Sequence, residues 1–355
     1  TGGNSTLSNF LPTSGVLPTY TGGITSAQDT AYQNAGGKLL TISGTLNLTS
    51  DGTARTFYMG GTGVTVISAV VGNGATAGSV LRNVMQPSTG INQGPGLLIL
   101  SGTVANTFTG GFDFTNGVTQ NNMAGTLTPF GAGGRLAFNT SGYFQSAVDL
   151  TGANKLTNTI VFGNGTTGTV AYFQGAQNIQ IAGAATNSDA SNSVFVNGAM
   201  TVTLDSTLGL SGSTTARNFT VGGTGNLTVA GIVGNNGGAT TGGAGTLVKN
   251  GSGTLTLQAA NVFTGSLTIN AGALNAANVG TGANQLGANI FNMGGGSLSS
   301  TKADATASTQ TYASATLTAN TSSSITLSTV SGGSQTFNLV TTTAAITRNA
   351  ASTVG

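Results

Sequence analysis

The sequence predicts an all-β fold arranged as a β-solenoid, in which the chain winds into coils that stack on one another. Three observations lead to it: short apolar–polar alternations, turn signals between them, and an internal repeat. Helix signals are nearly absent, because Ala-rich pieces are short and broken by Gly. The 355 residues include 59 Gly and five Pro without the period of collagen, and 38% of them are apolar, which argues against disorder.

The strand signals are stretches in which apolar residues alternate with Thr or Asn, as at Leu46-Asn47-Leu48 and Leu255-Thr256-Leu257. This period of two is typical of a strand with one buried face. Turn signals separate the stretches, among them Asn-Gly at 164–165, 197–198 and 250–251. With strands about 8–12 residues apart, a sandwich, a barrel and a solenoid all remain open at this point.

An internal repeat favours the solenoid. Residues 41–74 align with residues 203–236 at a constant shift of 162, and 15 of the 34 aligned positions are identical. We therefore expect two related copies of about 160 residues, made of coils of about 20–25 residues whose apolar faces stack in register. The core aromatics that we expect to stack are Phe57, Phe108, Phe219 and Phe263.

One stretch of the repeat fits only with an offset. Val64-x-Val66 and Leu227-x-Val229 agree after a slip of one residue. Because such a slip moves a strand's side chains to the opposite face of the sheet, we expect a bulge or a shortened turn in one copy.

The stretch from Lys249 to Leu274 resembles the autotransporter-associated β-strand repeat, and Gln93–Gly117 is a second match. It contains the Gly-x-Gly-x-Leu-x-Leu, Asn-x-Phe-Thr-Gly and Asn-Ala-Gly-x-Leu elements of that motif. The resemblance implies a right-handed parallel β-helix in a protein exported to the bacterial surface. Such passengers usually precede a membrane-embedded β-barrel translocator, whose amphipathic strands we do not expect within residues 299–355.

The predicted organisation has four parts: an N-terminal cap or extended arm over 1–37, a first solenoid copy over 38–190, a second copy over 191–310, and C-terminal strands or a cap over 311–355. The main alternative is a β-sandwich fibre subunit, since short alternating strands fit two packed sheets as well.

The composition excludes several classes of function. The chain has nine Lys or Arg and seven Asp, and it has no Glu, His, Cys or Trp. Common zinc, haem and iron–sulfur sites therefore lack their ligands, and Ser–His–Asp and Cys–His catalysis lack their base. A net charge of +2 is too dilute for nucleic-acid binding. No apolar run is long enough for a transmembrane helix, and Asn, Ser, Thr and Gly dominate, which favours an extracellular or bacterial cell-surface location.

Carboxylates are the only candidates for acid–base chemistry. A solenoid could align distant ones, and three or more Asp and Arg on one face would favour a carbohydrate-active enzyme. Asp51 lies close to Arg55, but its Asp-Gly turn, and Ser213 at the equivalent position, favour a role in the turn. The seven carboxylates are Asp29, Asp51, Asp113, Asp149, Asp189, Asp205 and Asp304.

Arg55 and Arg217 occupy equivalent positions, each before a core Phe. They could contact anions or glycans, but we favour a guanidinium that ties corner carbonyls of adjacent coils. The Gly-Gly-Thr-Gly stretches at 60–63 and 222–225 lack the Asp of calcium-binding β-rolls and the strand–helix context of phosphate loops. We predict no catalytic, cofactor-binding or metal-binding residue.

The leading function hypothesis is a secreted, non-enzymatic bacterial structural protein that self-associates into an extracellular fibre or surface layer. Few charges repel copies of the chain from one another, and either open solenoid ends or the 1–37 arm could join neighbours. The second hypothesis is an autotransporter passenger-like adhesin that binds glycans or cell surfaces. The third is a β-helix carbohydrate-active enzyme.

Overall fold

The protein folds into two compact units, described here from a computed structural model. One unit comprises Thr1–Asn164 and Val170–Ala182, and the other comprises Gly165–Thr169 and Gly183–Gly355. The predicted domain limits at 37, 190 and 310 stay predictions. The structure describes residues 5–7, 19–34, 39–84, 96–163, 168–188, 190–278, 286–287, 290–302, 307–317, 322–329, 334–338 and 347–348.

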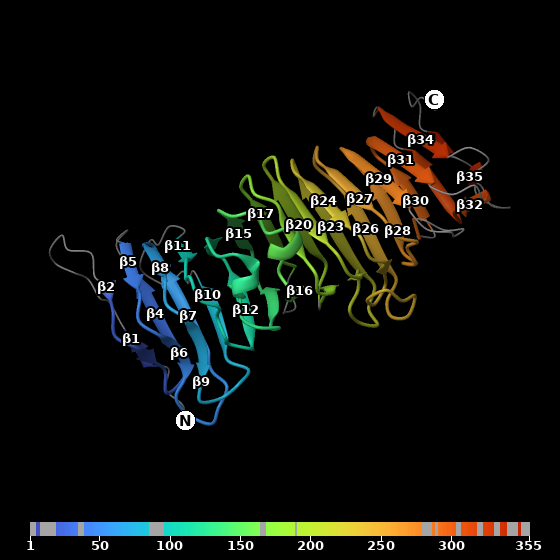
Figure 1. The fold of residues 1–355 in the computed structure, drawn as a ribbon. Coiled ribbons are helices and arrows are strands. Elements are labelled where there is room, and N and C mark those ends of the chain that lie inside the picture. Colours follow the sequence, from blue (N-terminus) through green and yellow to red (C-terminus); the bar gives the residue numbers. More distant parts are fainter. Residues whose placement is uncertain are drawn as a thin grey trace. The chain divides into compact units, whose positions relative to one another are not determined.

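The first unit has three parallel sheets, each named here by one of its strands. In the β7 sheet the strands β4, β7 and β10 lie side by side (Figure 1). The β7 sheet contains β1 (Ser5–Leu7), β4 (Thr30–Asn34), β7 (Thr56–Gly61), β10 (Val80–Val84), β12 (Gly111–Thr115), β14 (Arg135–Phe138) and β16 (Thr159–Phe162). The β8 sheet contains β2 (Thr19–Tyr20), β5 (Leu39–Ile42), β8 (Val64–Ile67), β11 (Leu97–Leu100), β13 (Val118–Asn121), β15 (Gly142–Ser146) and β17 (Val170–Gln174). The β6 sheet contains β3 (Ile24–Thr25), β6 (Leu46–Thr49) and β9 (Val71–Gly74), and β18 (Ile179–Ile181) bridges to Leu150 and Leu156.

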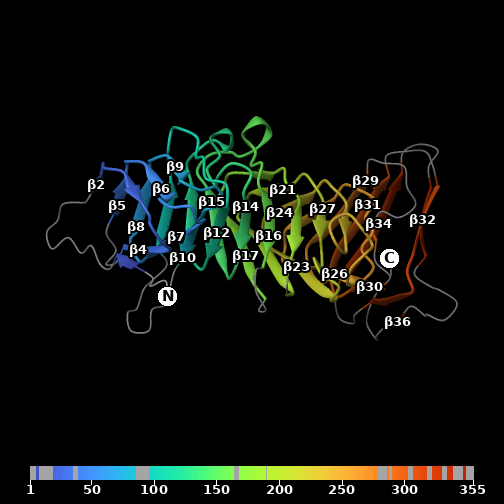
Figure 2. The same cartoon turned by 90° about the horizontal axis from the view of Figure 1, so that it is seen from below.

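The second unit repeats this construction, and its strands β21, β24 and β27 lie side by side (Figure 2). The β26 sheet contains β20 (Asn192–Asn197), β23 (Arg217–Gly223), β26 (Gly245–Lys249), β28 (Ser266–Ile269), β30 (Ile290–Met293), β33 (Ser314–Leu317) and β36 (Thr347–Arg348). The β27 sheet contains β21 (Thr201–Leu204), β24 (Asn226–Val229), β27 (Thr254–Leu257), β29 (Ala273–Asn278), β31 (Gly296–Lys302) and β34 (Ser323–Thr329). The strands β19 (Ala185–Asn187), β22 (Leu208–Gly209) and β25 (Val233–Gly234) also pair in parallel, and β32 (Ala307–Thr311) with β35 (Ser334–Asn338) forms a two-stranded sheet.

Parallel pairing between successive coils confirms the predicted β-solenoid and excludes the β-sandwich alternative, which needs antiparallel hairpins. Among the described residues only two isolated bridges are antiparallel. The helices described are two short 3₁₀ turns, η1 (Gly125–Leu127) and η2 (Gly152–Asn154). Coil length varies more than expected: Leu247 pairs with Leu267, 20 residues later, whereas Val64 pairs with Leu97, 33 residues later.

Inward apolar side chains form the core of each unit. The four expected aromatics, Phe57, Phe108, Phe219 and Phe263, are all buried. A larger ring cluster, which the sequence analysis missed, fills the first unit. Phe114 stacks on Phe138 with centroids 4.5 Å apart. The rings beside Phe114 are Phe112, Phe130 and Phe144, and those beside Phe138 are Phe162 and Phe173.

Glycines allow the coils to approach backbone to backbone at the corners. A Cβ atom added to Gly253 would lie against the carbonyl oxygen of Gly225, and one added to Gly96 would lie against that of Gly61, in both cases far inside contact distance. Gly61 also has a φ of 110°, which residues with a Cβ rarely adopt. The Gly-Gly-Thr-Gly stretches therefore serve as corners on which the next coil rests.

We expect Gly253→Ala to lower the free energy of unfolding by about 1–3 kcal/mol, because the backbone of the neighbouring coil must move to admit the methyl group. Gly52→Ala is the matched control, since a Cβ there meets nothing within 4 Å. Urea denaturation measures both. Equal stability of the two variants would mean that the coils separate at this corner without cost.

Candidate functional site

Asp51, the carboxylate that the sequence placed beside an arginine, belongs to its own turn. Its side chain accepts hydrogen bonds from Arg55, from the Thr53 N–H at 3.0 Å and from the Thr49 hydroxyl at 3.0 Å. The hydrogen bond from Arg55, with the backbone N–H of Thr53, lowers the pKa of Asp51 to about 2. Asp51 is therefore ionised at neutral pH and has no proton to donate as a general acid.

The interpretation of Arg55 and Arg217 as ties between corner carbonyls is wrong for Arg55. Its guanidinium pairs with Asp51 within the same turn, at 2.6 Å. Arg217 has Ser213 at the position of Asp51, and its Nε atom is buried without a hydrogen-bond partner among the described residues. The two equivalent arginines thus have different environments.

Three of the other predicted carboxylates are scattered along the described chain. Asp29 accepts the Thr56 N–H at 2.9 Å, Asp149 accepts the Thr151 hydroxyl, and Asp205 lies between β21 and β22. Asp189 and Asp304 lie outside the described residues. Within the described part of the chain, no group of three carboxylates is placed to hold a metal ion.

Asp113 is the exception, because stacking places it between two arginines. It lies on β12, in register with Arg82 on β10, and accepts from Nε of Arg82 at 2.8 Å and also from Nη2. Nη2 of Arg135 lies 3.5 Å from its other oxygen. The Asp113 side chain is fully buried although it lies on the outward face of its sheet. Tyr58 is in register with Arg82, and the centroid of its ring lies 5.2 Å from the guanidinium carbon of Arg82. We call Arg82, Asp113 and Arg135 the ion triad.

The ion triad matches in composition the Asp and Arg cluster expected of a carbohydrate-active enzyme, but its geometry differs from a catalytic one. It holds a single carboxylate, whereas glycoside hydrolysis generally uses two. The two arginines cover that carboxylate from solvent, so a substrate cannot reach it without displacing them. The triad therefore links three successive coils through ion pairs.

Six apolar side chains lie together on the outer face of the β8 sheet in its N-terminal coils. Leu39, Val64, Leu97 and Val118 form one column in register, and Val66 and Ile99 lie in the next column. All six alternate with buried residues of the same strands and are half-buried. We call these six side chains the apolar strip.

The bulge or shortened turn expected at Val64–Val66 is not present in this strand. Aligned residues of β8 and β24 keep the same facing: Thr65 is buried like its counterpart Leu227, and Val64 points outward like Asn226. The chain accommodates the inward Thr65 because the buried amide of Asn34 donates to its hydroxyl at 3.4 Å and to the Val64 carbonyl at 3.0 Å. The outward valines are therefore a surface feature.

Further along the same outer face, the columns change to aromatic and amide side chains. Tyr143 follows Val118 in register, and Tyr172 follows Tyr143, with ring centroids 4.5 Å apart and planes 7° from parallel. Gln120, Gln145 and Gln174 continue the column of Val66 and Ile99. We call these five residues the tyrosine–glutamine ladder.

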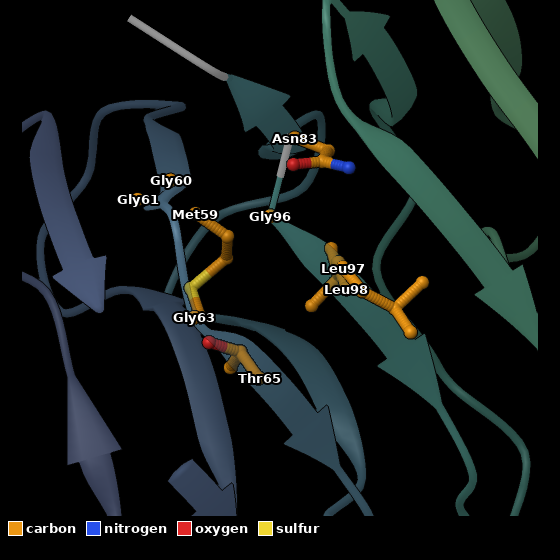
Figure 3. Close-up of a pocket in the computed structure, with 9 residues that line it drawn as sticks. All are labelled: Met59, Gly60, Gly61, Gly63, Thr65, Asn83, Gly96, Leu97 and Leu98. Carbon is orange, nitrogen blue, oxygen red and sulfur yellow. The ribbon is translucent and has the colours of Figure 1, made fainter. Parts of the chain in front are cut away.

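A small open pocket lies at the corner between β7 and β8, beside Asn83, Gly96 and Leu97 (Figure 3). Its free space is about 10 Å³, close to what one water molecule requires. It is too small to hold a metabolite.

The repeat motif interlocks neighbouring coils in the same way in both units. The Oδ1 atom of Asn106 accepts the N–H of Val71 at 2.8 Å, and that of Asn261 accepts the N–H of Val233 at 2.8 Å. Three residues further along the motif, hydrogen bonds run in the other direction. The backbone N–H groups of Thr109 and Thr264 donate to the side-chain oxygens of Asn73 and Asn235. These parts of the two copies therefore make the same contacts. The wider duplication stays a prediction.

Lys249, at the end of β26, points into the second unit. Its side chain is 1% exposed, and its ammonium donates to the carbonyls of Asn250 at 2.6 Å, Gly251 at 2.8 Å and Ala271 at 3.3 Å. Burial lowers the pKa of Lys249 to about 8. The lysine thus holds the turn of the repeat from within, at the cost of burying a charge.

The comparisons with known proteins agree with the resemblance seen in the sequence. A family model, the passenger-associated-transport-repeat, matches residues 92–120 and 247–276. The two matches coincide with the stretches that resemble the autotransporter-associated repeat, which confirms that expectation. No curated protein and no solved structure matched this chain. Among the described residues, no helix has the length and apolarity to cross a membrane.

For the ion triad, we expect Asp113→Asn to lower the free energy of unfolding by about 1.5–3 kcal/mol, since it leaves two neighbouring guanidinium groups without their shared counterion. Asp51→Asn, at the exposed pair with Arg55, is the control and should have a much smaller effect. Urea denaturation of both variants at pH 7 tests this. A loss no larger than the control's would show that the triad does not stabilise the fold.

For Lys249, stability should depend on pH in a defined direction. Its pKa is lower in the folded chain than the usual 10.5, so the unfolded chain binds more protons between about pH 8 and pH 10.5. The free energy of unfolding should therefore rise by about 2 kcal/mol from pH 8 to pH 10 relative to a Lys249→Met variant. Parallel denaturant titrations of the two proteins measure the difference. A constant difference across that window would contradict the lowered pKa.

Proposed function

We propose that this chain, with two passenger-associated-transport repeats on a parallel β-solenoid, is a secreted, passenger-like surface protein whose task is structural. It associates with copies of itself into an extracellular fibre or surface layer, and it has no enzymatic activity. The observation that carries this proposal is the apolar strip on the outer face of the β8 sheet.

The apolar strip has the chemistry of a protein contact. Its six side chains come from four successive coils, and neither of its columns contains a charged residue. Contiguous outward apolar side chains on a sheet face are typical of an interaction surface, because burying them removes apolar area from water. The flat, regular column of one copy offers a matching surface to the same column of another.

A comparison within the chain supports a specific role for the strip. At the positions aligned with Val64 and Val66, the second unit has Asn226 and Thr228, which also lie on outward positions of their strand. A solenoid strand therefore forms with polar residues at these outward positions. The valines of the first unit are not needed for its fold, and association accounts for them.

Two features support the absence of catalysis. The carboxylate of Asp113 is covered by Arg82 and Arg135, and Asp51 is committed to its turn with a pKa of about 2. A substrate could reach Asp113 only by displacing these arginines, and the ionised Asp51 has no proton to donate.

The test copies the polar pattern of the second unit into the first. Val64→Asn combined with Val66→Thr removes the centre of the apolar strip and leaves the inward Thr65 and Ile67 unchanged. We expect the wild type to form larger species as its concentration rises in sedimentation velocity, and the double variant to associate about tenfold more weakly.

Val248→Thr is the matched control, because it removes an outward valine from β26 in the second unit. It should associate like the wild type. A wild type that sediments as a monomer at every soluble concentration would refute self-association, and a double variant that associates normally would remove the strip from the interface.

A further inference from the structure

We infer that the tyrosine–glutamine ladder is a binding site for a neutral, linear polysaccharide that lies along the stacking direction of the coils. This inference goes beyond the proposed self-association, because it concerns a different set of side chains and a different partner. It is carried by the arrangement of Tyr143, Tyr172, Gln120, Gln145 and Gln174 on one outward face.

The tyrosines form one wall of the site. Tyr143 and Tyr172 are half-buried and stack with centroids 4.5 Å apart, so their phenol ends point outward in a row that follows the coil axis. Each ring alternates with a buried phenylalanine of the same strand, Phe144 or Phe173, which fixes the direction of the tyrosine. The ring edges give an apolar contact for the C–H groups of a sugar, and phenol groups can exchange hydrogen bonds with its hydroxyls.

The glutamines form the other wall, two residues along each strand and thus about 6.6 Å away. Gln174 donates to Gln145 at 3.1 Å, Gln145 donates to Gln120 at 2.8 Å, and Gln120 donates to Asn122 at 2.8 Å. An amide has two N–H donors and an oxygen with two lone pairs. Each glutamine in this chain of hydrogen bonds therefore keeps one N–H and at least one lone pair for a ligand, held in a fixed orientation by its neighbours.

The absence of charge in the ladder selects the class of ligand. No Lys, Arg or Asp lies in either column over these strands. A charged polymer would lose its hydration without gaining an ion pair, whereas a neutral polyhydroxylated chain finds donors, acceptors and apolar edges together. Because the side chains repeat at each coil, a ligand that also repeats gains several equivalent contacts at once.

The ladder differs from the apolar strip next to it, which has no hydrogen-bonding side chain and suits a protein surface. The two sites can therefore be tested separately, and failure of one leaves the other standing. Val64→Asn with Val66→Thr alters only the strip, and Tyr143→Leu alters only the ladder while keeping an apolar side chain on the strand.

The experiment measures retention of the full chain by the linear polymers cellulose, chitin, β-1,4-mannan and amylose, with polygalacturonate as the charged comparison. We expect retention by at least one neutral polymer and none by polygalacturonate. Tyr143→Leu should weaken the affinity about tenfold, and Gln145→Leu should weaken it as well, while the strip variant binds like the wild type. Thermal unfolding of each variant separates loss of binding from loss of fold.

Failure of all four neutral polymers to retain the protein would overturn the inference. Unchanged affinity of a folded Tyr143→Leu variant would do so too. Retention that vanishes in the strip variant would assign carbohydrate binding to the apolar strip and would also overturn it.

Discussion

Every other feature of this protein depends on the direct contact of one coil's backbone with the next. The strands pair parallel and in register, and at corners such as Gly61–Gly96 and Gly225–Gly253 there is no room for a side chain between coils. The motif asparagines add to this contact, since Asn106 and Asn261 each accept a backbone N–H from the preceding coil. Because coils cannot separate or slide there, each residue is aligned with its counterparts above and below.

Because of this alignment, the chemistry of the surface is set by columns of stacked residues and not by single residues. On the β8 sheet, one outward column changes from leucine and valine to tyrosine, and the next column changes from valine and isoleucine to glutamine. Neighbouring side chains in a column touch from one coil to the next, so a stacked pair of rings and a chain of amide hydrogen bonds form without any further structure. The two candidate contact surfaces of the first unit arise in this way.

Six of the charged residues hold coils and turns. Arg82, Asp113 and Arg135 join three coils, and Asp51 with Arg55 closes one turn. Lys249 places its ammonium among three carbonyls of the repeat turn. With these charges occupied, the outer faces of the sheets interact mainly through apolar contacts and neutral hydrogen bonds, which agrees with a structural or adhesive role.

The sequence by itself determined the parallel solenoid, the buried Phe57, Phe108, Phe219 and Phe263, and the two transport repeats, because strand period, glycine corners and motif spacing are local properties. Only the tertiary structure decided which faces are outward and which distant residues meet. Val64 and Val66 look like core residues, and they are outward because Asn34 satisfies the inward Thr65. Asp113 meets Arg82, 31 residues earlier, and Arg135, 22 residues later. Coil lengths vary too widely for that register to be counted along the chain, since insertions at the corners change the spacing without changing which strands pair.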